Sequence, residues 1–163
     1  MKKQVVVIMG SKSDRVTAEA VKATLASFDI PCHLRIASAH KTPRQLLQML
    51  EGYEADGQVG VYITIAGRSN ALSGLVDANV TAPVIACPPP SDAFAAEDLF
   101  SSLRMPSGVC PAVVLEPANA ALLAAKVLAV ADASLREAIA TYHQRLREGI
   151  EKDDEALQRQ KHA

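Results

Sequence analysis

The sequence predicts an α/β fold in which a doubly wound parallel sheet lies between two layers of helices, followed by a long C-terminal helix. Short, uninterrupted apolar runs rich in Val and Ile are typical of strands buried on both faces. They alternate with amphipathic helical patterns, which implies parallel pairing in a three-layer, flavodoxin-like or Rossmann-like arrangement. No linker of biased composition interrupts the pattern, so residues 1–163 are expected to form one domain with its α/β core in about 1–131.

Five strands are expected from these runs. The clearest reads Val-Val-Val-Ile-Met and stops at Gly10, where a polar turn begins. Pro31 restarts the chain as the second strand, and Pro88 stops the fourth. The expected strands are residues 5–9, 32–36, 59–65, 83–87 and 111–116.

Helices are expected after the strands, each with one apolar side. In the first helix this side consists of Val16, Ala20, Val21, Leu25 and Phe28. Shorter or Ala-rich patterns predict further helices at about 71–77, 93–103 and 119–130.

The second helix has a clear start signal. Thr42 is the expected N-cap, Pro43 takes the first helical position, and Gln45 would close a capping box. The expected buried side is Leu46, Leu47, Leu50 and Tyr53.

The C-terminal segment, about 134–160, predicts a helix that is too long for the body of the protein. Ser134 and Glu137 would form its capping box. About 26 helical residues span roughly 39 Å, whereas a domain of this size has a radius of gyration of about 15 Å. We therefore expect the helix to reach another subunit; the alternative is that it breaks near Gly149. Its apolar stripe is Leu135, Ile139, Tyr142, Leu146, Ile150 and Leu157.

Composition excludes several classes of protein. Hydrophobic residues make up 49% and charged residues 21%, which excludes a disordered or collagen-like chain. A net charge of −1 argues against a nucleic-acid partner or an anionic membrane partner. No apolar run approaches the length of a membrane span, and the one behind Met1 ends at Met9, too soon for an export signal. Three cysteines without a CxxC pair fit a reduced, cytoplasmic protein.

Three loops with small and polar residues follow strand ends, at residues 10–14, 38–41 and 66–70. The carboxyl ends of parallel strands meet at one edge of a sheet, and each loop leads into a helix, so free N–H groups and helix dipoles would face one crevice. Gly10 and Gly67 would allow close backbone approach. This arrangement suits a phosphate, although any single loop has a purely structural reading as well. The hydroxyl groups available there belong to Ser11, Ser13, Ser38 and Ser69.

His40 is the candidate acid/base group because, of the four histidines, it alone lies on a strand-to-helix turn at this edge. An imidazole ordinarily titrates near pH 6.5 and is a usable proton acceptor at neutral pH. The alternative is a histidine that only binds loop carbonyls. Lys41 adds a positive charge for a phosphate, and Asp14 could accept hydrogen bonds from ribose hydroxyls or serve only in a capping box with Ser11. The other histidines are His33, His143 and His162.

Other reactive residue types are expected to be structural. No spacing of His, Cys and carboxylates resembles a metal site. Cys87 ends a strand and is expected to be a buried structural thiol rather than a nucleophile. Glu97, Asp98, Asp153 and Asp154 are expected to be ordinary solvated charges on helices. The residues alone therefore predict an α/β protein that binds a small phosphorylated, ribosylated compound beside one acid/base histidine.

Five segments also carry a resemblance to a known family: Met-Gly-Ser-Lys-Ser-Asp at 9–14, Ser-Ala-His-Lys-Thr-Pro at 38–43, Ala-Gly-Arg-Ser-Asn-Ala-Leu at 66–72, and residues 102–108 and 119–124. Together they resemble the phosphoribosylaminoimidazole carboxylases of de novo purine synthesis, over nearly the whole chain. One branch of that family, a mutase, has Arg after the histidine and a second histidine in the third loop. Here Lys41 follows His40 and the third loop has none, which is similar to the branch that takes carbon dioxide directly.

The resemblance implies that 5-aminoimidazole ribonucleotide (AIR) reacts with carbon dioxide to give its 4-carboxylate (CAIR), without biotin, ATP or a metal. It implies His40 as general acid/base and a homo-oligomer, either a tetramer or an octamer. The residues that match the family's nucleotide site are Ser11, Asp14, Ser38, Lys41, Gly67 and Ser69, with Ser13 and Arg68 as neighbours.

Three alternatives stay open. The nearest is the mutase, which rearranges the N5-carboxylated isomer of CAIR. A flavodoxin-like module is another, although aromatic residues at 4% with no Trp leave little to stack on a flavin. A nucleotide sensor without catalytic activity is the third.

Overall fold

The computed structural model describes residues 2–90 and 97–160 and contains a sheet of five parallel strands in the order β2-β1-β3-β4-β5. The strands are β1 (Gln4–Met9), β2 (Cys32–Ile36), β3 (Val59–Ile65), β4 (Val84–Ala86) and β5 (Ala112–Val113). The first four agree with the prediction to within one residue at each end. The fifth is much shorter than 111–116, because only two of its residues pair with β4.

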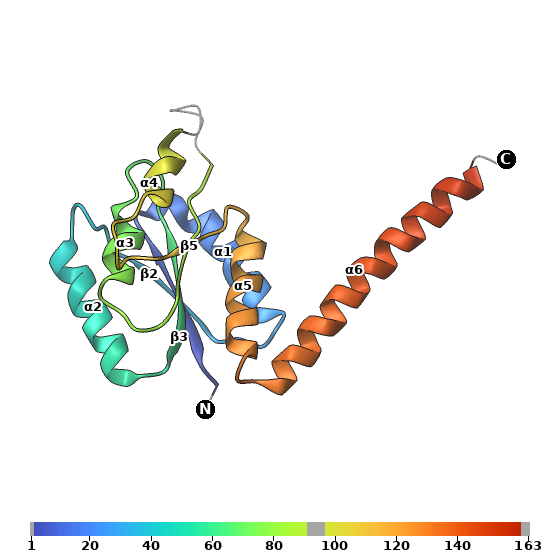
Figure 1. The fold of residues 1–163 in the computed structure, drawn as a ribbon, viewed down its shortest axis with the longest axis horizontal. Coiled ribbons are helices and arrows are strands. Elements are labelled where there is room, and N and C mark those ends of the chain that lie inside the picture. Colours follow the sequence, from blue (N-terminus) through green and yellow to red (C-terminus); the bar gives the residue numbers. More distant parts are fainter. Residues whose placement is uncertain (1, 91–96, 161–163) are drawn as a thin grey trace.

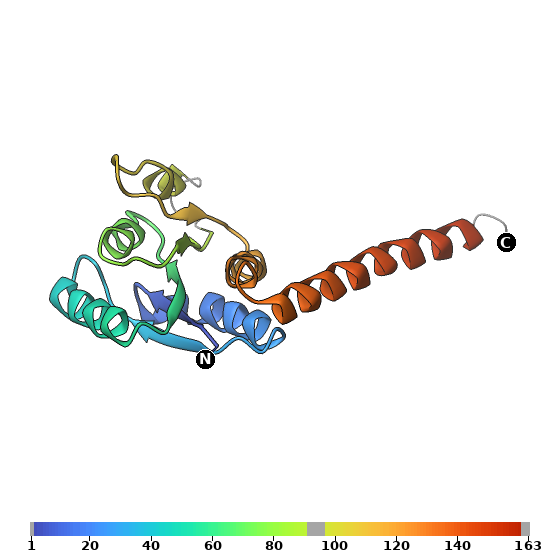
Figure 2. The same cartoon turned by 60° about the horizontal axis from the view of Figure 1, so that its bottom comes forward.

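Helices cover both faces of this sheet (Figures 1 and 2). One face carries α1 (Arg15–Ala26) and α5 (Pro117–Ala129), and the other carries α2 (Pro43–Asp56) and α3 (Ala71–Asp77). The short helices η1 (Lys12–Asp14), η2 (Glu97–Leu99) and α4 (Phe100–Leu103) follow strand ends, and α6 (Ala133–Gln160) completes the chain. The predicted three-layer α/β architecture is confirmed. The expected helix over 93–103 is seen only as η2 and α4, since its first residues lie outside the described ones.

The central strands are buried on both faces, as their uninterrupted apolar runs predict. Val5 and Val7 on β1 pack into the cluster under α1 and α5, whereas Val6 and Ile8 pack into the cluster under α2. All four side chains are completely buried. This strict alternation follows from the two-residue period of a strand, and β1 lies inside the sheet, between β2 and β3.

The predicted apolar side of α1 is partly wrong. Val16 is 84% exposed and Ala20 is exposed, whereas Ala18, Val21 and Leu25 are fully buried. Positions two residues before and after Ala18 lie about 200° around the helix from it, so they face solvent. On α2, Met49 is buried beside Leu46 and Leu50, while Leu47 and Tyr53, which were expected inside, are half-buried.

Two expected capping boxes do not form. The Thr42 side chain makes no cap hydrogen bond to α2 and instead bonds to Ser38, so Gln45 closes no box. At α6 the Asp132 carboxylate accepts hydrogen bonds from the Leu135 N–H (3.1 Å) and the Ser134 hydroxyl (2.7 Å). The cap of α6 is therefore Asp132, because a carboxylate is the stronger acceptor for the free N–H groups of a first turn.

Helix α6 runs without a break through Gly149 and projects away from the sheet (Figures 1 and 2). Its first part packs on the core, where Leu135 and Ile139 are buried and Tyr142 makes an edge-to-face contact with Phe28. Farther along the same stripe, Leu146, Ile150 and Leu157 are 51%, 71% and 53% exposed. None of the helices within 2–90 and 97–160 is long and apolar enough to cross a membrane.

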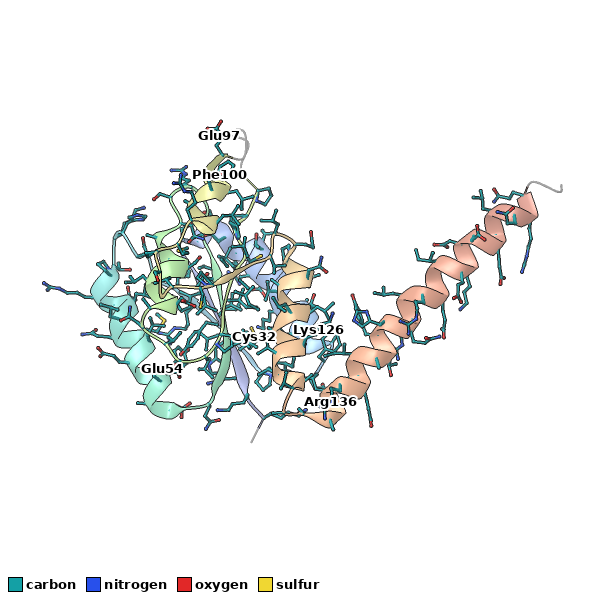
Figure 3. The ribbon with its side chains drawn as sticks, in the orientation of Figure 1. Cys32, Glu54, Glu97, Phe100, Lys126 and Arg136 are labelled. Carbon is teal, nitrogen blue, oxygen red and sulfur yellow. The ribbon has the colours of Figure 1, made fainter. Side chains whose placement is uncertain are left out.

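Glu54 on α2 (labelled in Figure 3) is bonded to β3 and to the loop before β4, and it makes stability depend on pH. Its carboxylate accepts hydrogen bonds from the Thr81 N–H (2.9 Å), the Thr81 hydroxyl (2.8 Å) and the buried Tyr62 hydroxyl (3.0 Å). Burial raises the pKa of Glu54, but these hydrogen bonds outweigh it and the net pKa lies below its ordinary value. A lowered folded-state pKa means that the contribution is present above the unfolded pKa and is lost as the pH falls.

Glu54→Gln is therefore expected to lower the free energy of unfolding at pH 7 by about 1 kcal/mol, since the carboxylate is partly solvated and the amide offers one acceptor where the carboxylate has two. The deficit should shrink as the pH falls below about 4. Urea unfolding at both pH values measures it, with the exposed Glu51→Gln on the same helix as control. A deficit of equal size at both pH values would contradict this account.

Candidate active site

The three polar loops meet in one cleft, of about 700 Å³, at the carboxyl edge of the sheet. The loops follow β1, β2 and β3, which are neighbours in the sheet. From β1 the chain passes first to β2 on one side and then to β3 on the other, so the strand order reverses next to β1, the position where open α/β sheets form a ligand crevice. The structure brings together every residue that the sequence singled out there: Ser11, Ser13, Asp14, Ser38, His40, Lys41, Gly67, Arg68 and Ser69.

Backbone hydrogen bonds join the starts of the three loops along the carboxyl edge of the sheet. The Gly10 N–H donates to the Ile65 carbonyl (2.9 Å), which joins the end of β1 to the end of β3. The Ala37 N–H donates to the Met9 carbonyl (3.0 Å), which joins β2 to β1. A Cβ at Gly10 would lie 3.4 Å from the Ala66 Cβ, at the near limit of ordinary van der Waals contact, so the first and third loops are close neighbours there. At Gly67 a Cβ would meet only Pro89, at 3.6 Å, so the protein's own packing does not require a glycine there.

The first loop presents a carboxylate with one free oxygen. Asp14 Oδ2 accepts hydrogen bonds from the Ser11 N–H (2.9 Å) and the Ser11 hydroxyl (3.1 Å). The expected local capping contact between Ser11 and Asp14 is therefore present, and it occupies only one of the two carboxylate oxygens. Within the described residues, Oδ1 has no partner and is left to accept from a ligand. The Ser11 and Ser13 hydroxyl oxygens lie 2.5 Å apart and form a pair of groups that a ligand oxygen could meet together.

The second loop holds His40 on a tight turn, with its imidazole exposed to the cleft. The Ser38 carbonyl accepts the Thr42 N–H (2.9 Å), and the Thr42 hydroxyl accepts the Ser38 N–H (3.0 Å). The Ser38 hydroxyl accepts the Lys41 N–H (3.2 Å), which leaves its own proton for a ligand oxygen. Thr42 thus closes the turn that carries the histidine, which is the physical reason why it does not cap α2.

The third loop is fixed from behind by residues that the sequence analysis missed. The Arg68 N–H donates to Asp98 Oδ2 (3.1 Å), and the Asn70 N–H donates to the Ser101 hydroxyl (2.9 Å). The expectation that Asp98 is an ordinary solvated charge is therefore wrong: it is half-buried and bonded to a loop some thirty residues earlier. No local pattern signals such a contact, because the partners are separated by about thirty residues in the sequence.

Part of the cleft lining is apolar and was not anticipated. It consists of Ala39, Ala66 and Leu72 together with Pro89 and Pro90. The run of three prolines after the fourth strand was a usable signal, since the end of that strand reaches the same edge. Apolar side chains of this kind limit the access of water to a bound ligand. None of the described residues that line the cleft is Phe, Tyr or Trp, so this part of the chain offers no aromatic platform for a flavin there.

The remaining candidates lie elsewhere. Cys87 is fully buried, and its thiol points to the Leu115 carbonyl (3.7 Å). Burial, with a smaller effect of Glu116, raises the pKa of Cys87 to about 11, so it is a protonated structural thiol as expected. His33 is exposed on the edge strand β2 and His143 lies on α6, while His162 is outside the described residues.

The chemistry of the cleft suits an anionic ligand with hydroxyl groups. Two cationic side chains, Lys41 and Arg68, and the serine hydroxyls can bind a phosphate. The free oxygen of Asp14 can accept from sugar hydroxyls. An exposed imidazole lies among them and can take or give a proton at an atom of the ligand.

Comparisons with known proteins point to one family. Residues 4–149 match the family model described as AIR carboxylase. The chain is 50% identical over 159 residues to a phosphoribosylaminoimidazole carboxylase of Treponema denticola, covering 98% of this chain and 100% of the relative. It is 51% identical to the enzyme of the same name from Archaeoglobus fulgidus, covering 93% of this chain and 83% of the relative. The crystal structure of Treponema denticola PurE superposes with a TM-score of 0.94 at 49% identity, covering 96% of this chain and 99% of that one.

Proposed function

The chain belongs to the AIR carboxylase family, and from this membership we propose that its cleft carries out the reversible carboxylation of AIR by carbon dioxide to CAIR, a step of purine biosynthesis. It is a phosphoribosylaminoimidazole carboxylase, as its close relatives are named. The observation that carries the mechanism is the position of His40: its exposed imidazole shares one cleft with the groups that suit a nucleotide phosphate and ribose.

His40 acts as the proton carrier of the reaction. The amine of AIR pushes electron density onto the neighbouring ring carbon, which attacks carbon dioxide, so that a C–C bond forms and one C=O electron pair moves to oxygen. The ring carbon then holds both a hydrogen and the carboxylate. His40 takes that proton, and the electron pair of the C–H bond restores the aromatic ring. In the reverse direction the imidazolium returns the proton and the C–C bond breaks.

The other residues of the cleft hold the substrate in range of the imidazole. Lys41, the serine hydroxyls of the first two loops and the loop N–H groups bind the phosphate. Asp14 accepts from the ribose hydroxyls through Oδ1, because Ser11 occupies the other oxygen. Ser69, Arg68 and the backbone at Gly67 complete the anion-binding side. Carbon dioxide offers few groups that a protein can bind. The site therefore works mainly by positioning AIR and by excluding water with its apolar side chains.

Direct use of carbon dioxide, rather than the mutase reaction, rests on two sequence features. Lys41 follows His40, and the third loop, residues 66–70, has no histidine, whereas the mutase branch has its second histidine in that loop. Relatives from animals, such as the human bifunctional enzyme at 42% identity over 129 residues, are named carboxylases as well.

The branch assignment is tested by a substrate comparison. The enzyme is given AIR with bicarbonate as the source of carbon dioxide or, separately, the N5-carboxylated isomer, and CAIR formation is measured. We expect CAIR from AIR and none from the isomer beyond its spontaneous breakdown. Reaction of the isomer alone would overturn the branch assignment, and reaction of neither would overturn the proposed activity.

The protein works as a homo-oligomer in the cytoplasm. Support for the oligomer comes from the outer half of α6, whose apolar stripe has no cover within the described chain. A helix this exposed has only marginal stability without packing partners. A second copy of the chain is therefore the natural partner for the stripe. Tetramers and octamers both accommodate such a contact.

Lys41→Ala is expected to raise the KM for AIR by about 10- to 100-fold and to lower kcat less, because a charge-assisted hydrogen bond to the phosphate is lost. For the nucleoside, which lacks the phosphate, the same substitution should have a much smaller effect. Steady-state kinetics with both substrates measure this, and the exposed Arg44→Ala on α2 is the control. An equal effect on both substrates would show that Lys41 does not bind the phosphate.

A further inference from the structure

We propose that Asp98 and Ser101 are positioning residues for the nucleotide: together they hold Arg68 in a left-handed backbone conformation and so shape the anion-binding side of the cleft. This inference rests on the proposed function, since it concerns how the same site recognises the phosphate and ribose of AIR. Neither side chain lines that cleft. Both lie on the segment 97–103, at the end of the molecule where Glu97 and Phe100 are labelled in Figure 3.

The third loop contains a backbone conformation that its sequence does not favour. Arg68 has φ of +56°, and it shares a positive φ with only one other non-glycine residue in 2–90 and 97–160, Asp29. A residue with a Cβ is disfavoured in this region, and Arg lacks the short polar side chain that lets Asn or Asp adopt it. Such a conformation persists only where the surroundings impose it.

Asp98 and Ser101 supply that restraint. Asp98 Oδ2 accepts the Arg68 N–H at 3.1 Å, and the Ser101 hydroxyl lies 2.8 Å from the Arg68 carbonyl oxygen, to which it can donate. Ser101 also accepts the Asn70 N–H at 2.9 Å and lies 2.7 Å from the Asp98 carbonyl. Both backbone groups of the strained residue are therefore held by side chains from one short segment.

A buried polar layer anchors that segment to the sheet. The Asn70 amide donates to the hydroxyls of Ser73 (2.6 Å) and Ser102 (2.9 Å), and its oxygen accepts the Ser73 N–H (3.2 Å). Thr64 on β3 donates to the Ser73 hydroxyl at 3.0 Å. All four side chains are at least 97% buried and have hydrogen-bond partners. This layer is therefore rigid and fixes the position of segment 97–103 relative to the third loop.

The hydrogen bonds that Asp98 and Ser101 form with Arg68, here called the clamp, hold the third loop from the side opposite the cleft. Gly67 and Arg68 form a wall shared by the cleft and an adjoining cavity of about 580 Å³, and Asp98 lies on the far side of that wall. Because the Arg68 N–H is taken by Asp98, the loop meets a ligand through its neighbours and through the Arg68 side chain. Release of the clamp would let Arg68 return to a favoured conformation, which would turn the peptide groups on either side of it.

A double-mutant cycle on nucleotide affinity tests the clamp. Asp98→Ala is made in the natural chain and in an Arg68→Gly background, and the KM and Kd for AIR are measured together with kcat. Glycine adopts a positive φ unaided, so we expect about a tenfold loss of affinity in the natural chain and little further loss in the glycine background. Asp98→Asn, which keeps an acceptor oxygen, should lose less, and Glu97→Ala is the matched control.

A general loss of structure would lower affinity equally in both backgrounds, and this result, or no loss in the natural chain, would overturn the proposal. Ser101→Ala, carried through the same cycle, gives a second reading if Asp98→Ala folds poorly. Failure of the natural chain to bind or carboxylate AIR would instead refute the proposed function, so the two failures are distinguishable.

Discussion

His40→Asn is expected to lower turnover by roughly 10²- to 10⁴-fold, the usual contribution of a general acid or base, while AIR still binds. Asparagine keeps part of the shape and one hydrogen-bond donor of the imidazole but cannot take a proton from carbon. The turn that carries residue 40 is closed by Ser38 and Thr42, so the substitution should leave the loop in place.

The measurement is kcat in both directions, with AIR affinity determined separately by calorimetry. The control is His33→Asn, an exposed histidine on the edge strand β2 that does not line the cleft. Turnover at the natural rate in His40→Asn would refute the assignment of the base. Loss of AIR binding with unchanged kcat would make His40 a binding residue only.

The double variant Leu146→Glu, Ile150→Glu is expected to break the proposed homo-oligomer into smaller species. These two side chains are 51% and 71% exposed in the single chain and lie on the stripe whose inner part covers the core. Burial of such a side chain stabilises a contact by about 1.5–3 kcal/mol, and a closed assembly repeats each contact in every subunit. Two carboxylates per helix would replace that gain with repulsion and a desolvation penalty.

Light scattering coupled to size exclusion reports the mass of the particles. Glu148→Gln on the opposite side of α6 is the matched control and should leave the mass unchanged. Circular dichroism of the dissociated form should retain the α/β core, since the buried part of α6 begins at Leu135 and ends near Tyr142. If the double variant has the same particle mass as the unsubstituted protein, the stripe is not an interface between copies.

The strands and most helices were predictable because their signals are local. The run Val5–Met9 is buried on both faces and reads as such without any knowledge of its neighbours. The buried side of α1 was predicted only in part, because its apolar residues occur on two sides of the helix and a local signal does not choose between them. Only the packing against α5 selects Ala18 over Val16. The capping boxes of α2 and α6 failed because a nearer partner, Ser38 or Asp132, competes for the same hydroxyl.

The site was predictable in outline because parallel strands bring their carboxyl ends to one edge, whatever their order. Ser11, His40 and Ser69 are far apart in sequence, yet this rule alone is enough to gather them. The support behind the third loop was not predictable. The partners of Arg68 and Asn70 lie some thirty residues later, in a segment whose position depends on how α4 packs on α3.

The most direct test of the account is a crystal structure of the enzyme with AIR bound. We expect an imidazole nitrogen of His40 within about 3.5 Å of the ring carbon that receives the carboxylate, with the phosphate at Lys41 and the ribose at Asp14. An AIR molecule that binds with this ring carbon turned away from His40, or outside the cleft, would contradict the account.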